Sequence, residues 1–299
     1  MTTIDVPLKY SNTDEYITPP HAFCPGCGLA LAMRYCLKVL GDKVIMVTTA
    51  GCTGPGSGGS LVHNGKRIDT IGTPFGNIAM FAGGISSALK AQGDTETLVV
   101  GWGGDGATFD IGFGGISASA ERNEDFLFIC VDNEGYQNTG NQRSSASPWM
   151  STGATTPPGF AKMEYKKDIG TILAAHRVPY VATATVGYPD DLMAKVEKAK
   201  NLKGFRFLHI YIPCPAGWGC ASERTMEISR LVVDTKVFPI YEVENGINLT
   251  ISRQPKERPL SDYLGTQRRF NSITAEQVSN FEKDVEERWR RLQFLASYG

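Results

Sequence analysis

The stretch 99–140, VVGWGGDGATFDIGFGGISASAERNEDFLFICVDNEGYQNTG, decides the expected fold of this 299-residue chain. An apolar run at 97–101 predicts a buried strand, and residues 113–122 have helical spacing. A second apolar run at 126–131 predicts another buried strand. Such a strand–helix–strand unit is typical of open parallel sheets, which bind their ligands at the carboxyl ends of the strands.

Polar residues follow both predicted strands. Asp105 lies between Gly104 and Gly106 after the first strand, and Asn133 follows the second. A carboxylate and an amide carbonyl are oxygen ligands that suit Mg²⁺, which commonly keeps bound phosphates as further ligands. The glycines would let the backbone approach a diphosphate and donate N–H groups to it. The alternative is an ordinary Gly-Asp-Gly turn; the two strands and the second oxygen ligand favour a diphosphate–metal site.

Length and charge exclude several classes of protein. The chain can form one large domain or two modest ones. Its 30 Lys and Arg nearly balance its 31 Asp and Glu, so the charge does not indicate a nucleic acid or membrane partner. No apolar run reaches the roughly 18 residues of a membrane span, and residues 1–10 lack a signal core. We expect a cytoplasmic protein whose seven cysteines are thiols or metal ligands.

The cysteines give a second chemical signal. Cys24 and Cys27 form a Cys-x-x-Cys turn, and Cys52 follows the next predicted strand. The fourth ligand could be Cys214 or Cys220, which both follow a later strand. Four thiolates fit structural zinc or a [4Fe–4S] cluster, and the spacing does not decide between them. The alternative is a redox dithiol or a turn that starts a helix.

The remaining pattern alternates helices with strands, which predicts an α/β fold with a mostly parallel sheet. Cys36 and Cys130 lie inside apolar periodic segments and are expected in the core. Residues 69–76 are expected to form a loop, and the pattern weakens after Glu223. Further helices are expected at 29–40, 77–91, 165–176, 190–202 and 274–295, and further strands at 43–48, 180–186, 207–212, 238–244 and 247–251.

In combination these motifs resemble the β subunit of the 2-oxoacid:ferredoxin oxidoreductases. The resemblance rests on CPGCG at 24–28, GDG at 104–106, DNEGYQNTGNQRSSASP at 132–148 and PCPAGWG at 213–219. It implies the thiamine-diphosphate-binding fold, a mostly parallel sheet with helices on both faces.

The resemblance also implies a division of the chain and a magnesium site. Residues 1–20 would be an arm, 21–223 the cofactor-binding α/β domain, and 224–299 an extension that packs on the domain or on a partner subunit. Mg²⁺ would be held by Asp105 and Asn133. The third magnesium ligand implied by the resemblance is the backbone carbonyl of Gly135. The resemblance also implies that Gly104, Gly106 and Cys52 contact the thiamine diphosphate.

By the same resemblance, Cys24, Cys27, Cys52 and Cys214 bind one [4Fe–4S] cluster near the thiamine. Asn138 matches an active-site asparagine near the reacting carbon. The implied partners are α, γ and ferredoxin-like δ subunits, with ferredoxin as the electron acceptor. Thiamine enzymes need a glutamate that touches the aminopyrimidine; the family takes it from another subunit, so this chain alone is expected to be inactive.

The implied reaction is oxidative decarboxylation of a small 2-oxoacid. Pyruvate-specific members carry an aromatic and Thr/Pro-containing stretch after the third cysteine, whereas residues 51–60 here read GCTGPGSGGS. Such a loop offers N–H donors and no apolar wall, which favours oxalate. Arg143 could steady a substrate carboxylate, although a solvated loop arginine is favoured.

Several alternatives stay open. The first is a pyruvate synthase β subunit that uses coenzyme A. The second is a thiamine-dependent decarboxylase or ligase with structural cysteines. The third is a zinc-stabilised interaction module without catalysis. The colour and the metal content of anaerobically purified protein would separate these possibilities.

Overall fold

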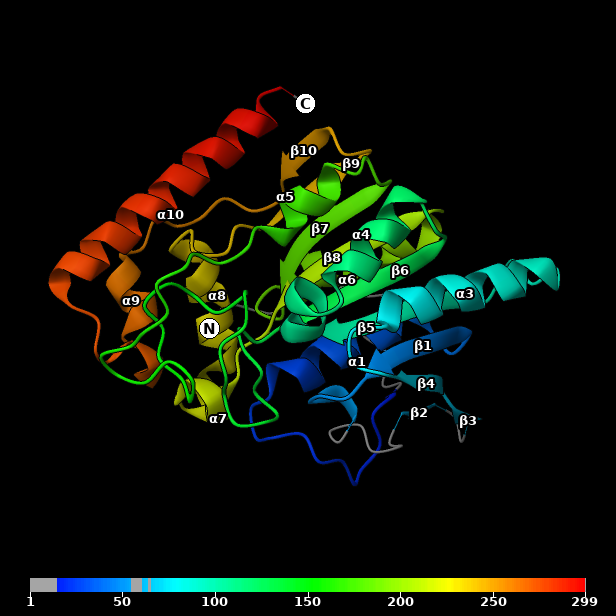
Figure 1. Cartoon of the computed structure of the whole chain (residues 1–299), viewed down its shortest axis with the longest axis horizontal. Helices are drawn as coiled ribbons and strands as arrows, with labels where there is room; N and C mark the ends of the chain where they lie inside the picture. Colours follow the sequence, from blue (N-terminus) through cyan, green and yellow to red (C-terminus); the bar gives the residue numbers. More distant parts are fainter. Residues whose placement is uncertain (1–14, 55–60, 64–65, 299) are drawn as a thin grey trace.

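A computed structural model describes residues 15–54, 61–63 and 66–298, which form an α/β fold around one eight-stranded sheet (Figure 1). Its strands are β1 (Val44–Thr49), β4 (Asp69–Thr73), β5 (Leu98–Gly104), β6 (Phe126–Asp132), β7 (Tyr180–Thr185), β8 (Phe205–Tyr211), β9 (Tyr241–Glu244) and β10 (Asn248–Ile251). The strand order is β10-β9-β7-β8-β6-β5-β1-β4. All pairs are parallel except those of β9 with β7 and β10, which confirms the expected mostly parallel sheet.

Helices cover both faces of the sheet and form a third core beside it. One face packs on α1 (Gly28–Leu40) and α6 (Pro189–Asn201). The other packs on α3 (Ile78–Ala91), α4 (Phe113–Glu121) and α5 (Ile169–Ala174). The third core contains residues of α7 (Pro215–Trp218), α8 (Thr225–Asp234), α9 (Leu260–Leu264) and α10 (Ala275–Ala296). A short hairpin is formed by β2 (Val62–His63) and β3 (Lys66–Arg67).

Two local predictions need correction. The loop expected at 69–76 is wrong, because β4 occupies Asp69–Thr73 and pairs with β1. Four of the five β4 residues are exposed at the edge of the sheet, so the strand has no apolar alternation. The helix expected at 165–176 spans only Ile169–Ala174, since Asp168 caps its start by accepting the Thr171 N–H.

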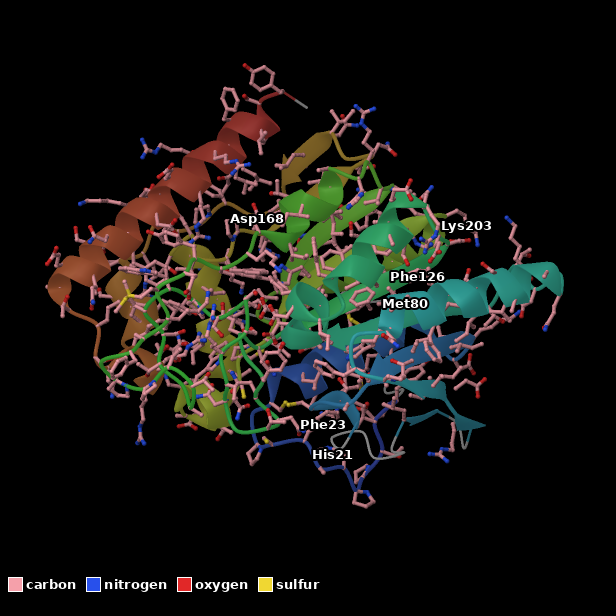
Figure 2. The ribbon with its side chains drawn as sticks, in the orientation of Figure 1. His21, Phe23, Met80, Phe126, Asp168 and Lys203 are labelled. Atoms are coloured by element: carbon pink, nitrogen blue, oxygen red, sulfur yellow. The ribbon has the colours of Figure 1, made fainter. Side chains whose placement is uncertain are left out.

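Because the strands are parallel, their carboxyl ends lie together at one end of the sheet, where ligands bind. Gly104, at the end of β5, is paired in register with Val131 near the end of β6. This register brings Asp105 and Asn133 to the same edge, as the sequence predicts. Lys203 marks the opposite end, where β6 begins (Figure 2). Among the described residues, no helix has the length and apolar character needed to cross a membrane.

Candidate functional site

A cavity of about 350 Å³ opens at the carboxyl ends of β1, β5 and β6. Its volume lies in the range of small-molecule sites, about 300–1,000 Å³. Thr48 and Thr49 contribute from β1, and Leu29 contributes from α1. Seven sequence-predicted residues line it: Cys52, Gly104, Asp105, Gly106, Asn133, Gly135 and Asn138.

Three oxygen-bearing groups converge at this cavity. One terminal atom of the Asn133 amide lies 2.9 Å from the Gly135 carbonyl oxygen and 3.0 Å from Asp105 Oδ1. In the chain alone this atom is best assigned as nitrogen, because it then donates to both oxygens. A cation would favour the opposite amide orientation, with three oxygens toward the ion. The donor set therefore fits Mg²⁺, which prefers carboxylate and carbonyl ligands.

Asp105 is 1 % exposed, and its Oδ2 accepts a hydrogen bond from the Ser144 hydroxyl. Burial raises the pKa of Asp105 well above its ordinary value, and the negative charge of Asp132 raises it further. A divalent cation at Oδ1 would offset both effects by favouring the carboxylate.

The glycines around Asp105 have different reasons to be small. A side chain on Gly104 would meet nothing closer than the Val131 carbonyl oxygen at 4.0 Å, so the backbone here is open to a ligand. A side chain on Gly106 would lie 2.3 Å from the Tyr136 ring. Gly104 therefore fits the predicted approach of a diphosphate, whereas Gly106 is required by the packing of Tyr136.

Buried ion pairs support the chain behind Asn133. Asp132 Oδ2 lies 2.6 Å from Lys166 Nζ and 2.7 Å from His209 Nε2. Burial alone would raise the pKa of Asp132, but the charges of Lys166 and His209 lower it to about 2. Lys166 also contacts Glu134 Oε1 at 2.8 Å. Sequence analysis missed this network because its partners come from separate elements.

The structure brings four of the cysteine thiols together. The pKa of Cys214 is raised to about 12, mainly by burial. The charges of Cys24, Cys27 and Cys52 raise it further, so these side chains lie close to Cys214. Burial and the charges of Cys27 and Cys24 likewise raise the pKa of Cys52 to about 11. Phe23, beside Cys24, lies at the lower edge of the molecule (Figure 2).

Cys220 stands apart from this group. Burial raises the pKa of its thiol, and the charged neighbours that act on it are Arg269 and Arg224 rather than cysteines. Cys36 and Cys130 are fully buried, which confirms that they are core residues. The geometry therefore favours Cys214 over Cys220 as the fourth member of the group.

The cysteine group offers thiol ligands of the kind that zinc or an iron–sulfur cluster binds. Within the part of the chain that the structure describes, no three His, Cys, Asp or Glu side chains are placed to hold one metal ion. Structural zinc needs four ligands that converge on one point, whereas a [4Fe–4S] cluster is held by four cysteines spread around it. The thiols brought together here are ligands of the type that both kinds of site use.

Of the two remaining predicted residues, one lines the cavity and the other does not. Asn138 is exposed at the cavity, where it can reach a bound molecule. Arg143 does not line the cavity and instead pairs with Glu164 at 3.2 Å, which confirms the solvated loop arginine. Trp102 lines the cavity with a buried indole N–H that has no acceptor among the described residues. Its position three residues before Asp105 was a signal that sequence analysis passed over.

This fold and cavity define a thiamine-diphosphate-binding domain. The family described as "Thiamine pyrophosphate enzyme, C-terminal TPP binding domain" matches residues 62–210. The chain is 41% identical over 293 residues to the pyruvate synthase subunit PorB of Methanocaldococcus jannaschii, which covers 93% of this chain and 97% of the relative. It is 40% identical over 293 residues to the ketoisovalerate oxidoreductase subunit VorB of Pyrococcus abyssi, with 95% and 94% covered. The chain belongs to the β-subunit family of the 2-oxoacid:ferredoxin oxidoreductases, as its motifs predict.

A solved structure agrees with this family. The chain resembles a 2-oxoglutarate:ferredoxin oxidoreductase from Magnetococcus marinus with a TM-score of 0.56 and 26% identity over 67% of each chain. That enzyme was solved with 2-oxoglutarate, coenzyme A and succinyl-CoA bound. None of these three relatives is named for oxalate, so they favour the pyruvate alternative over the oxalate prediction.

Proposed function

We propose that this chain is the cofactor-binding subunit of an oxidoreductase that decarboxylates an aliphatic 2-oxoacid such as pyruvate, with coenzyme A as the acyl acceptor and ferredoxin as the electron acceptor. The observation that carries the proposal is that Asn133 and Asp105 line the same cavity as Cys52. The cavity therefore joins the oxygen ligands to one member of the cysteine group. A cofactor beside Asn133 would therefore lie next to an electron acceptor held by Cys52.

The residues present would hold three groups. Asp105, Asn133 and Gly135 would bind Mg²⁺, and Gly104 would face the diphosphate. A [4Fe–4S] cluster would be held by Cys24, Cys27, Cys52 and Cys214. When bound, thiamine diphosphate supplies the nucleophilic carbon and the cluster accepts single electrons. Asn138, at the open side of the cavity, would orient the substrate.

The cavity wall supports an aliphatic substrate over oxalate. Leu29, Phe75, Trp102 and Val131 form apolar parts of the wall, and all four lie outside the 51–60 loop on which the oxalate prediction was based. Residues 51–53 do line the cavity, but 55–60 lie outside the described residues. Burying the second carboxylate of oxalate against an apolar wall would be costly, whereas a methyl or branched alkyl group would be favoured.

The cavity also supports the need for a partner subunit. No glutamate is among the described residues that line it, so the glutamate that thiamine enzymes require would come from another chain. The relatives are themselves named as subunits. We accordingly propose α, γ and ferredoxin-like δ partners, and an isolated chain without turnover.

The test is acceptor reduction by the anaerobically purified complex with pyruvate, ketoisovalerate or oxalate, with and without coenzyme A. We expect reduction that depends on coenzyme A with one of the first two acids and none with oxalate. Oxalate-driven reduction without coenzyme A would overturn the substrate proposal. Metal analysis should find about four irons per chain in this subunit; zinc in their place would restore the interaction module.

A further inference from the structure

Glu134 holds a strained position between two proposed metal ligands. It separates Asn133 from Gly135, and its φ of 59° lies in the left-handed region, which is uncommon for residues other than glycine. The side chain is 2 % exposed. Strained backbone of this kind persists only where the surrounding structure fixes it. We call residues 133–135 the metal turn.

Arg269 provides much of that fixing. Its NH2 group donates to Glu134 Oε2 at 2.5 Å, and its Nε donates to Gln267 at 2.8 Å. Its guanidinium also lies 3.9 Å from the centre of the Trp218 ring, a close cation–π contact. Arg269 is 135 residues beyond Glu134, in the segment 224–299 predicted as an extension.

Trp218 connects Arg269 to the metal turn and to the backbone around Cys214. Its indole N–H donates to the Asn133 carbonyl oxygen at 2.9 Å, and its backbone N–H donates to the Cys214 carbonyl oxygen at 2.9 Å. The Cys214 sulfur accepts from the Gly217 N–H at 3.4 Å. Residues 214–218, here the Cys214 turn, are therefore tied to the metal turn through one indole ring.

We infer that Arg269 is a positioning residue that holds the metal turn and the Cys214 turn in one fixed arrangement. The inference rests on the proposed function, because it concerns the residues assigned to Mg²⁺ and to the cluster. Lys166 is the natural comparison: it also binds Glu134, but its other partner is Asp132. Loss of Arg269 should disturb both turns, and loss of Lys166 only the metal turn.

The chemistry of arginine suits this role. Its planar guanidinium can donate to a carboxylate along its edge and stack on an aromatic ring with its face. Arg269 does both at once, toward Glu134 and Trp218. A lysine would keep the positive charge beside Glu134 but lose the flat contact with the ring. Arg269→Lys therefore tests the contact with the Trp218 ring separately from the positive charge beside Glu134.

The experiment compares Arg269→Met, Lys166→Met and Arg206→Met in the purified complex. Two quantities are measured: the Kd of thiamine diphosphate at saturating Mg²⁺, and the EPR spectrum and midpoint potential of the reduced cluster. Arg269→Met and Lys166→Met should each raise the Kd about 10- to 100-fold, the usual effect of removing a residue that supports a metal ligand. The cluster signals should shift in Arg269→Met alone.

Arg206→Met is the control for general destabilisation. Arg206 is fully buried and pairs with Asp125 at the opposite end of the sheet, so it should lower the melting temperature and leave Kd and EPR unchanged. Arg269→Lys retains the charge, so it should fold even where Arg269→Met does not, and should shift the EPR spectrum. Wild-type Kd and EPR signals in whichever Arg269 variant folds would overturn the inference. A wild-type complex that binds no thiamine diphosphate would instead refute the proposed function.

Discussion

The two halves of the site are built in opposite ways. Asp105 and Asn133 follow neighbouring strands of one sheet, and Asp132 beside them is fixed by buried ion pairs. The cysteines come from three distant segments: 24–27 before α1, Cys52 after β1, and Cys214 after β8. Asp105 and Asn133 thus come from two neighbouring strands, whereas the sulfur ligands come from segments far apart in the sequence.

This difference implies that the oxygen ligands and the cysteine ligands depend on their bound groups to different extents. The oxygen half should keep its shape without a ligand, because hydrogen bonds and ion pairs within the chain already satisfy it. The sulfur half has Cys24 exposed, so in the proposed function its final geometry would be set by the bound cluster. The following variants test that contrast, from the largest expected effect to the smallest.

The cysteine half gives the largest effect. Cys214→Ser should abolish iron binding in the complex, because it removes a thiolate from the group that the structure brings together. Cys220→Ser should retain full iron, since Cys220 stands apart from the other thiols. Iron and sulfide analysis of both variants, purified anaerobically, is the measurement. Iron loss in Cys220→Ser with normal iron in Cys214→Ser would transfer the role to Cys220.

The oxygen half should lose its ligand and keep its fold. Asp105→Ala should weaken thiamine diphosphate binding by about 100-fold or more, because Mg²⁺ loses its carboxylate. The metal-free protein should unfold at the same or a higher denaturant concentration, since a buried negative charge next to Asp132 is removed. Calorimetry and urea unfolding measure the two effects. Normal thiamine occupancy in folded Asp105→Ala would contradict the assignment.

A smaller effect is expected from the hydroxyl that orients Asp105. Ser144→Ala removes the hydrogen bond to Asp105 Oδ2 and should weaken Mg²⁺ binding about tenfold. Ser145→Ala is the matched control, because its hydroxyl bonds to Asp110 and does not touch Asp105. The comparison is made by titrating Mg²⁺ at fixed thiamine diphosphate. Equal affinities in the two variants would show that the carboxylate needs no orienting donor.

The last effect concerns stability rather than ligand binding, and it is a pH dependence in the loop behind the metal turn. Lys162 is 2 % exposed and donates to the Ser147 and Glu164 carbonyl oxygens at 2.7 Å each. Burial lowers its pKa from 10.5 to about 8. Between these values the unfolded chain binds more protons, so the free energy of unfolding should rise with pH, by at most about 1.4 kcal/mol per pH unit.

Lys162→Met should remove this rise, and Lys203→Met, which changes an exposed lysine at the opposite end of the sheet, should preserve it. Urea unfolding at pH 7, 8, 9 and 10 would follow the change. Identical pH profiles in Lys162→Met and the wild type would show that the lysine is charged in the fold across this range.

The oxygen half was also the half that sequence could predict. Strands at 97–101 and 126–131 have clear apolar runs, and their carboxyl ends meet in any parallel sheet. Asp105 and Asn133 were therefore placed together from the pattern alone. The edge strand β4 was missed because its pairing with β1 is through the backbone and leaves no apolar signal.

The supporting residues could not be predicted in the same way. Arg269 and Trp218 act through contacts that span 135 and 85 residues of sequence, and no local pattern records such distances. Among the cysteines, spacing left Cys214 and Cys220 equal. The family resemblance selected Cys214, and the folded chain, which places Cys214 rather than Cys220 near the other thiols, favours the same choice.

The origin of the cysteines in distant segments has a consequence for biosynthesis. In the proposed arrangement Cys27 leaves the ribosome 187 residues before Cys214. At about 5–20 residues per second, roughly 10–40 s separate the first thiols from the last. The nascent chain thus carries an incomplete set of thiols throughout this interval, exposed to oxidation and to foreign metals. In this arrangement the full cluster could be delivered only after Cys214 has been synthesised, late in translation or after it.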